Sequence, residues 1–144
     1  LLCDIRIVAE DAKIGANFAR LGIHPGLGIS GRLPRLIGQE AAAELLFTGK
    51  LIRGSEAAAM GLARRAVPKE QVLHEAMQLA REIAAAAPLA VRAIKQTLRT
   101  SGTEDLSAVL QREALAQAIL SQTADASEGV RAQMSRQTPD FKGR

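Results

Sequence analysis

The sequence predicts an α/β chain whose first part, residues 1–68, mixes short strands with turns and whose second part, residues 69–144, is helical. Three observations support this division. Apolar residues alternate with charged ones near the start, as they do in a strand. Glycines and prolines then punctuate residues 22–38, which is typical of tight turns. From residue 69 onward, apolar residues recur at the spacing of amphipathic helices.

In the first part, we expect a strand over residues 2–9, followed by the polar Glu10–Asp11 turn. Residues 12–15 are expected to pair with that strand as a second extended piece. Residues 22–38 should then form turns in which backbone segments approach closely, because spaced glycines permit such contacts.

Two helices are expected before residue 68. The first covers residues 39–47 and stops at Gly49. The second is short, is capped by Ser55 and runs to Met60 before Gly61 ends it.

Four helices are expected in the second part. Pro88 suits the first turn of the second of them, Thr103 is expected to cap the third, and Asp125 with Glu128 forms a capping-box pattern at the start of the last. The apolar faces of the first three are Val72, Leu73, Ala76, Leu79, Ala80 and Ile83; then Val91, Ile94 and Leu98; then Leu106, Val109, Leu110, Ala114 and Ala118.

Composition limits the possible functions. The net charge is +4, but aromatic residues make up only 2% and no sustained basic run occurs, so a nucleic-acid partner is not expected. No apolar run is long enough for a membrane span, and no metal-binding motif is present. The single cysteine, Cys3, excludes an internal disulfide, is expected to be buried and fits a reducing cytoplasm. The abrupt apolar start at Leu1 suggests that the whole protein is longer.

Two segments carry a family resemblance. The sequence CDIRIVAEDAKIGANFARLGIHPGLGISGRLPRLIG over residues 3–38 and LLFTGKLIRGSEAAAMGLARRAVP over residues 45–68 are similar to the carboxy-terminal portion of the enoyl-CoA hydratase/isomerase (crotonase) family. The tail closes in a similar way with Arg136, Pro139, Phe141 and Gly143.

The resemblance implies the end of a crotonase-like ββα spiral over residues 1–68, followed by an α-helical trimerisation region over residues 69–144. It implies a homotrimer or a dimer of trimers that acts on an acyl-CoA thioester and needs no other cofactor. In the family layout, the two backbone N–H groups of the oxyanion hole and the first catalytic glutamate precede Leu1. Such an oxyanion hole stabilises the enolate that develops from the thioester.

One position departs from the family pattern. The family segment Q-P-E-x-x-L-G, counted back from Leu21, puts Phe18 where hydratases have their second glutamate. Phenylalanine carries no exchangeable proton, so it cannot be a general acid or base. Either Phe18 packs in the acyl pocket, or the pocket is remodelled for another acyl-CoA reaction. The resemblance also places Asn17, Leu21 and Pro25 beside the substrate. Arg20 is either a surface or interface charge or a partner for a substrate carboxylate.

His24 and Gly26 are the candidate catalytic residues. A histidine side chain can both give and take a proton, so His24 is either an acid–base group or a local hydrogen-bonding residue. In related hydratases the amide at the position of Gly26 helps hold the attacking water, and a glycine there also lets substrate approach closely. The alternative is that Gly26 only shapes the turn.

Arg136 and Lys142 are candidate contacts for the phosphates of coenzyme A. The resemblance aligns Arg136 with a basic residue that reaches these phosphates from a neighbouring subunit, and Lys142 lies close behind it. Arg136 could equally stabilise the end of a helix without any ligand.

Three function classes follow. The first is an enoyl-CoA hydratase/isomerase-like enzyme; the fragment alone would lack most of the reaction centre. The second keeps the thioester activation but performs isomerisation or thioester hydrolysis. The third is a trimeric scaffold without catalysis.

Overall fold

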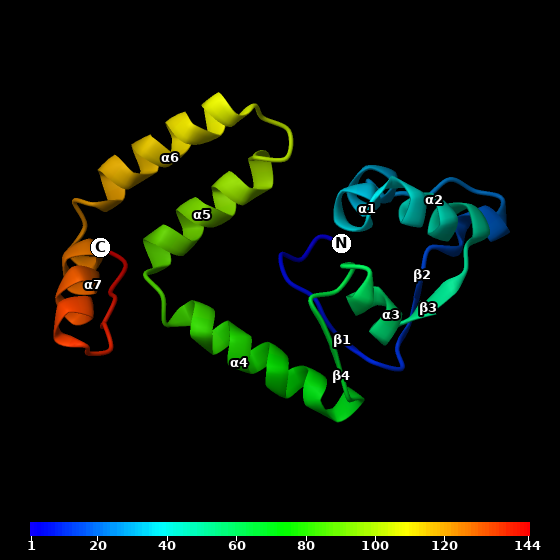
Figure 1. The fold of residues 1–144 in the computed structure, drawn as a ribbon, viewed down its shortest axis with the longest axis horizontal. Helices are drawn as coiled ribbons and strands as arrows, with labels where there is room; N and C mark the ends of the chain where they lie inside the picture. Colours follow the sequence, from blue (N-terminus) through cyan, green and yellow to red (C-terminus); the bar gives the residue numbers. More distant parts are fainter. The chain divides into compact units, whose positions relative to one another are not determined.

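Four short strands, all within residues 7–67, form two separate two-stranded sheets (Figure 1). The computed structural model describes residues 1–144 in two compact units, Leu1–Met77 and Gln78–Arg144. In the first unit, β1 (Ile7–Ala9) pairs in parallel with β4 (Arg65–Val67), and β2 (Lys13–Gly15) pairs antiparallel with β3 (Leu51–Arg53). The expected pairing of residues 12–15 with residues 2–9 is therefore wrong.

The hydrogen bonds around β1 explain why no hairpin forms. The Ala12 N–H donates to the Ala9 carbonyl oxygen (3.1 Å), which closes a tight turn and redirects the chain. The edge of β1 pairs with β4 instead, and the Glu10 N–H extends this pairing to the Val67 carbonyl oxygen (2.9 Å). In the other sheet, Ile14 lies opposite the buried Ile52, so apolar burial favours the β2–β3 register.

The strand is also shorter than expected at its start. Residues 1–6 precede β1 without strand geometry. Arg6 holds this segment in place, because its Nε donates to the Leu62 carbonyl oxygen and its Nη1 to the Cys3 carbonyl oxygen, both at 2.7 Å. Cys3 itself is exposed, which contradicts its expected burial.

The glycine-rich segment contains a helix that its glycines and prolines did not predict. α1 (Ile29–Ile37) forms because Ile29, Leu33, Leu36 and Ile37 share one helical face and pack on the core. Pro34 lies inside this helix and removes only the N–H that would bond to the carbonyl of Ser30. The expectation of turns alone over residues 22–38 is therefore wrong from Ile29 onward.

α2 (Gln39–Thr48) ends as expected at Gly49, which adopts the left-handed conformation with φ 58°. α3 (Gly54–Ala59) has a different cap from the expected one. Its N-cap is Arg53, whose N–H donates to the Glu56 carboxylate (2.7 Å). Ser55 lies within the helix, and its N–H donates to the Glu10 carbonyl oxygen (3.2 Å), so the predicted Ser55 cap is wrong.

The core of the first unit lies among α1, α2, α3 and β3. Its buried members are Leu33, Ala42, Leu45, Ile52, Ala57 and Leu62. Gly54 is buried at the junction of β3 and α3, where a Cβ would stand 1.9 Å from the Ala9 carbonyl oxygen. Only a glycine fits this contact, which holds the start of α3 against the end of β1.

The rest of the chain is helical, as predicted. A short 3-10 helix, η2 (Lys69–Gln71), leads into α4 (Val72–Ala84), within which the two compact units divide. The second unit continues with α5 (Pro88–Thr100), which has Pro88 in its first turn, and then with α6 (Leu106–Leu120) and α7 (Ala124–Ser135). The expected assignment of separate roles to residues 1–68 and 69–144 stays a prediction.

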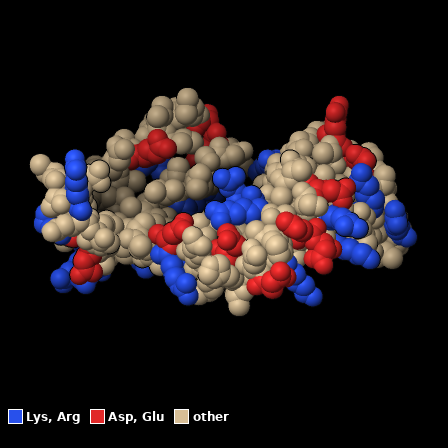
Figure 2. All heavy atoms as spheres, turned by 60° about the horizontal axis from the view of Figure 1, so that its bottom comes forward, with Lys and Arg blue, Asp and Glu red and all other residues tan.

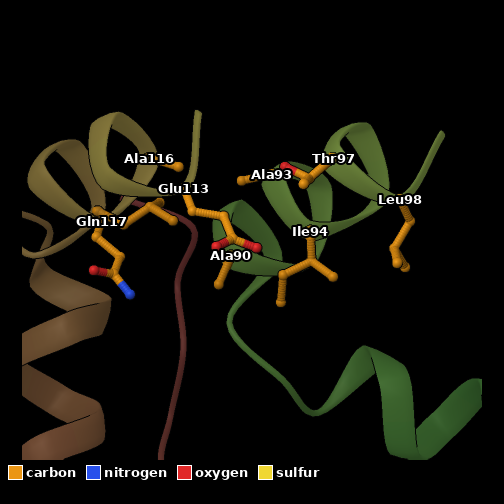
Figure 3. A pocket seen from close by; sticks show the side chains of 9 residues that line it. Ala90, Ala93, Ile94, Thr97, Leu98, Glu113, Ala116 and Gln117 are labelled. Atoms are coloured by element: carbon orange, nitrogen blue, oxygen red, sulfur yellow. The ribbon is translucent and has the colours of Figure 1, made fainter. Parts of the chain in front are cut away.

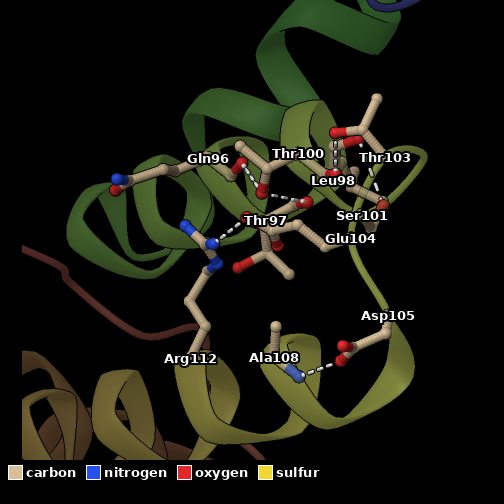
Figure 4. A network of polar contacts seen from close by, with 10 residues as sticks. All are labelled: Gln96, Thr97, Leu98, Thr100, Ser101, Thr103, Glu104, Asp105, Ala108 and Arg112. Carbon is tan, nitrogen blue, oxygen red and sulfur yellow. Dashed lines mark hydrogen bonds and ion pairs between the residues drawn. The ribbon is translucent and has the colours of Figure 1, made fainter.

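Two of the expected caps in the second unit are wrong. Asp105 caps α6, because its carboxylate accepts the Ala108 N–H (2.8 Å), whereas the Thr103 hydroxyl donates to the Thr100 carbonyl oxygen (Figure 4). The Thr123 hydroxyl caps α7 by accepting the Ala126 N–H (3.1 Å). Asp125 and Glu128 therefore form no capping box; their carboxylates bind the tail instead.

The apolar faces of α5 and α6 are not a core within this chain. Ile94 and Leu98 were expected to be buried but are 59% and 71% exposed. Leu106 and Leu110 on α6 are exposed as well. The helices of the second unit bury only Asp125 and Ala132, both on α7, and α5 and α6 pack on one another. Contiguous exposed apolar faces of this kind typically mark surfaces that bind another protein surface.

Charges are distributed without a dominant field on the face that Figure 2 shows, where Lys and Arg side chains lie among Asp and Glu side chains. This is compatible with the modest net charge of +4. None of the helices has the length and apolar character that crossing a membrane requires.

Candidate functional site

The candidate site begins with the 3-10 helix η1 (Asn17–Leu21), which contains Phe18, the residue expected at the position of the family's acid. Gly22 ends η1 in the left-handed conformation (φ 69°), and the Ile23 N–H donates to the Phe18 carbonyl oxygen (3.1 Å). The Phe18 side chain is half-buried, whereas Asn17 and Leu21 are exposed. The backbone around Phe18 is therefore held by its own turn.

Arg20 ties η1 to the end of α2. Its Nε donates to the Thr48 carbonyl oxygen (2.7 Å), one of the carbonyls that a helix end leaves without an internal partner. The approach is close, because a Cβ on Gly49 would stand 3.0 Å from the Arg20 Cγ and 3.1 Å from the Asn17 Cα. Arg20 thus has a structural role at this helix end, which the sequence did not reveal.

The turn between η1 and α1 has two left-handed residues in succession, Leu27 (φ 57°) and Gly28 (φ 69°). A β-carbon makes this region unfavourable, so Leu27 is strained, and its side chain is 82% exposed. The Ile29 N–H donates to the Gly26 carbonyl oxygen (3.2 Å) and closes the turn. Sequence inspection missed Leu27, since nothing in the letters G-L-G signals which residue adopts the positive φ.

Gly26 has no internal reason to be a glycine. Its φ lies outside the left-handed region, and a Cβ at this position would meet no atom within 4 Å. Its N–H donates no hydrogen bond within the chain. The turn alone therefore does not require a glycine here. An unpaired N–H on an exposed residue is suited to bind a water molecule or an oxygen atom of a substrate.

His24 makes a local hydrogen bond, as expected if its role is to hold the turn. Its Nδ1 lies 2.7 Å from the Pro25 carbonyl oxygen. Because a carbonyl oxygen only accepts, Nδ1 must carry the proton in this contact, and in the neutral ring Nε2 is then the basic atom. The side chain is exposed, so the geometry leaves Nε2 open to a ligand.

A hollow of about 390 Å³ lies next to this turn, between η1, α1 and α2. The structure brings His24 and Pro25 together in its lining, whereas Asn17, Phe18, Leu21 and Gly26 are not among the lining residues. Its remaining walls are mainly apolar side chains, including Ile23, Pro34, Leu46 and Phe47. Phe47 is 80% exposed, so this hollow is an open surface depression on the isolated chain.

The two candidate phosphate contacts lie in the second unit, near the end of the chain. Arg136 follows α7 in the left-handed conformation (φ 54°), and the Gln137 N–H donates to the Ala132 carbonyl oxygen (2.9 Å). This is the position that glycine usually occupies at a helix end. The Lys142 Nζ lies 2.7 Å from the Asp140 carboxylate in an exposed pair. Both cations are on the surface.

A second hollow, of about 450 Å³, lies between α5 and α6. Figure 3 shows Ala93, Ile94 and Thr97 of α5 across from Glu113 and Gln117 of α6. Near the α5–α6 loop, Arg112 pairs with Glu104 (Figure 4), while the Arg112 Nε and the Glu104 Oε2 are buried without a partner. Sequence analysis predicted no site here.

These features together are typical of the crotonase class: short paired strands, a glycine-bearing turn after η1 and a helical second unit. The chain belongs to the enoyl-CoA hydratase/isomerase family, which matches residues 1–144. Both the predicted family and the predicted fold class are confirmed.

Among proteins of known sequence, the chain is 39% identical to the 2,3-dehydroadipyl-CoA hydratase of Escherichia coli, over 100% of this chain and 56% of that protein. It is 38% identical to a short-chain-enoyl-CoA hydratase of Clostridioides difficile, over 90% of this chain and 84% of that protein. Among solved structures, an enoyl-CoA hydratase from Bacillus anthracis matches with a TM-score of 0.95 and 39% identity. That match covers 99% of this chain and 55% of the structure. The chain thus spans about half the length of this structure and of the Escherichia coli relative.

Proposed function

We propose that the protein carrying this chain is an enzyme that hydrates 2-enoyl-CoA thioesters. Family membership supports this, together with relatives that are named as hydratases of dehydroadipyl-CoA, short-chain enoyl-CoA and crotonyl-CoA. In this proposal the present chain supplies the glycine turn beside the substrate and the cations of the tail. The oxyanion hole and the first glutamate come from family elements that these residues do not include.

The observation that carries the proposal is the state of Gly26. Its N–H is unpaired, its φ is not positive and the space at its Cβ position is empty. A glycine that neither the backbone nor the packing of the chain requires is explained by a ligand that approaches the main chain. In a hydratase, that ligand is the attacking water, which the N–H orients.

Turnover of a short 2-enoyl-CoA by the complete protein tests the proposal, followed as loss of the conjugated-thioester absorbance. Gly26→Ala is expected to lower kcat/KM on the order of a hundredfold, because a methyl group displaces reactants from their aligned positions. Gly31→Ala is the matched control, since a Cβ there also meets nothing within 4 Å and φ is not positive. Equal activity of the two variants would show that Gly26 has no role in the reaction.

A second candidate reaction follows from Phe18. Without a carboxylate at this position, the protein would retain thioester activation but perform isomerisation or thioester hydrolysis. Phe18→Glu is expected to raise the hydration rate at least tenfold above that of Phe18→Gln, because a positioned general acid contributes about 10²–10⁴-fold. Phe18→Gln has nearly the same shape as Phe18→Glu but carries no titrating group. If wild-type protein isomerises or hydrolyses the substrate without hydrating it, the second reaction is correct. If acyl-CoA binds without any turnover, the scaffold hypothesis remains.

We also propose that the exposed apolar faces of α5 and α6 lie in a homotrimer or a dimer of trimers. The exposure of Ile94, Leu98 and Leu106 supports this, since exposed apolar surface of this extent usually has a partner. Sedimentation of the complete protein would detect a monomer if the proposal is wrong. A cytoplasmic location remains a prediction, with which the exposed thiol of Cys3 is compatible.

A further inference from the structure

The tail after α7 is held by a carboxylate that is almost completely buried. Asp125, in the first turn of α7, is 4% exposed. Its Oδ1 accepts the Lys142 N–H (2.7 Å), its Oδ2 accepts the Gly143 N–H (2.8 Å), and its own N–H donates to the Arg144 carbonyl oxygen (3.1 Å). One residue of the helix thereby binds three consecutive residues of the tail.

Glu128 makes a second attachment one turn further along α7. Its Oε1 accepts the Asp140 N–H (3.0 Å), and both carboxylate oxygens accept from the Arg131 guanidinium at 2.8 Å. The hydrogen bond from Arg131, and then the one from the Asp140 N–H, lower the pKa of Glu128 from 4.5 to about 2. Glu128 is therefore ionised at neutral pH, when it holds the tail.

These carboxylates are not required to start the helix, because the Thr123 hydroxyl already caps α7. Burying an ionised carboxylate is unfavourable unless hydrogen bonds replace its water, and the tail N–H groups supply those bonds for Asp125. The partial positive charge of the helix start favours an anion there as well. The Asp125 carboxylate therefore serves to bind the main chain of the tail and is not needed to cap the helix.

The attachment fixes the backbone of Lys142 and leaves its ammonium group accessible. The only ion pair of that ammonium is with Asp140, and the two side chains are 57% and 75% exposed. Exposed pairs of this kind contribute little, so a phosphate could replace Asp140 at low cost. A Lys side chain loses much conformational entropy when it binds a ligand, and a main chain that is already fixed reduces the total entropy lost.

We propose that Asp125 is a positioning residue for coenzyme A: by holding the main chain of residues 142 and 143, it places the Lys142 ammonium to bind the phosphates of the nucleotide half. This inference rests on the proposed function. It predicts that Asp125 affects recognition of the phosphorylated nucleotide and has no effect on the reacting acyl group.

The test compares one acyl group on two carriers, coenzyme A and pantetheine, which lacks the phosphorylated nucleotide. Asp125→Asn keeps the shape but turns an NH₂ group toward one of the tail N–H groups; Asp125→Ala removes both acceptors. In the complete protein, each substitution is expected to raise KM for the CoA thioester about tenfold. The reason is that the Lys142 ammonium would lose its hydrogen bond to the charged phosphate. Neither is expected to change kcat/KM for the pantetheine thioester more than about twofold. Cleavage by trypsin after Lys142 should become faster in both variants.

Asp105→Ala is the matched control, because Asp105 also accepts a backbone N–H near a helix start but has no contact with the tail. It should lower the melting temperature without changing the ratio of the two KM values. If the Asp125 variants lower activity on both thioesters equally, the residue is merely structural and the proposal is wrong; it is also wrong if neither KM changes.

One further variant, Lys142→Ala, separates this failure from failure of the proposed function. If wild-type protein prefers the CoA thioester, and Lys142→Ala removes the preference while Asp125→Asn and Asp125→Ala keep it, only the positioning role is wrong. If wild-type protein turns over neither thioester, or both equally well, the proposed function or its phosphate contact fails, and the role of Asp125 fails with it.

Discussion

Gly54→Ala should strongly destabilise the first unit, because the new methyl group would meet backbone atoms that cannot rotate away. The Cβ would lie 1.9 Å from the Ala9 carbonyl oxygen and 2.9 Å from the Ala9 carbonyl carbon. It would also lie 3.1 Å from the Val8 Cγ2. The oxygen is about 1.5 Å closer than the 3.4 Å at which ordinary contacts begin. Either the end of β1 or the start of α3 must therefore move.

The magnitude follows from what this movement disrupts. Overpacking a well-packed site typically costs about 1–3 kcal/mol. The Ser55 N–H to Glu10 carbonyl bond (3.2 Å) and the Glu10 N–H to Val67 carbonyl bond (2.9 Å) adjoin the clash. Weakening both adds about 1–2 kcal/mol, at about 1 kcal/mol for each hydrogen bond. The free energy of unfolding should fall by about 3 kcal/mol or more, and the melting temperature by about 10 °C for a chain of this size.

Thermal unfolding followed by circular dichroism measures this change. Gly31→Ala provides the control, because a Cβ at Gly31 meets nothing within 4 Å and an alanine favours the helix by up to about 1 kcal/mol. The reasoning is refuted if Gly54→Ala melts within about 2 °C of Gly31→Ala, a difference that corresponds to less than about 1 kcal/mol.

Two further predictions concern strain and acid stability. Leu27→Gly should raise the free energy of unfolding by about 0.5–1 kcal/mol, because relief of about 1–2 kcal/mol of left-handed strain exceeds the entropy cost of a glycine. Leu27→Ala keeps the strain and should not stabilise the protein. Urea unfolding measures both variants, and a more stable alanine variant than glycine variant would contradict this reasoning. Glu128→Gln should destabilise the protein at neutral pH, since the pKa of Glu128 is lowered to about 2 by Arg131 and Asp140. Because the lowered pKa contributes stability above pH 4.5 that is lost as pH falls toward 2, the melting temperatures of wild type and Glu128→Gln should converge over that range, and a constant difference would count against the contact.

Sequence patterns predicted the long helices well. Repeated apolar spacing identified α4, α5 and α6, and local chemistry located the end of α2 at Gly49 and the start of α5 at Pro88. These features depend on residues near one another in the chain. They could be read directly because a helix closes its hydrogen bonds within a few residues.

The strand pairing could not be predicted, because three-residue strands contain too little pattern to choose a partner. Ile14 packs opposite Ile52, and nothing near either residue identifies the other. The caps failed for a related reason. Ser55 and Thr103 are suitable cap residues, but neither caps a helix. The Ser55 N–H bonds to the carbonyl oxygen of the distant Glu10, and the Thr103 hydroxyl bonds to the Thr100 carbonyl oxygen.

For the site, the family motif located the turn around Gly26, but the unpaired state of its N–H depends on the three-dimensional structure. Asp125 and Glu128 have the spacing of a capping box, but their partners in the structure are main-chain groups of the tail, which the tail sequence does not indicate.

The parallel pairing of β1 with β4 has a consequence for the order in which the first unit folds. Ile7 cannot pair with Arg65 until the ribosome has synthesised all the residues between them. Closing so long a flexible segment also has an entropy cost that grows with its length. α1, α2 and the β2–β3 pair need only nearer neighbours, and their formation shortens the segment that remains to be closed. The β1–β4 pair should therefore form last, so a ribosome-bound chain would keep the edge of β1 open until β4 has left the exit tunnel.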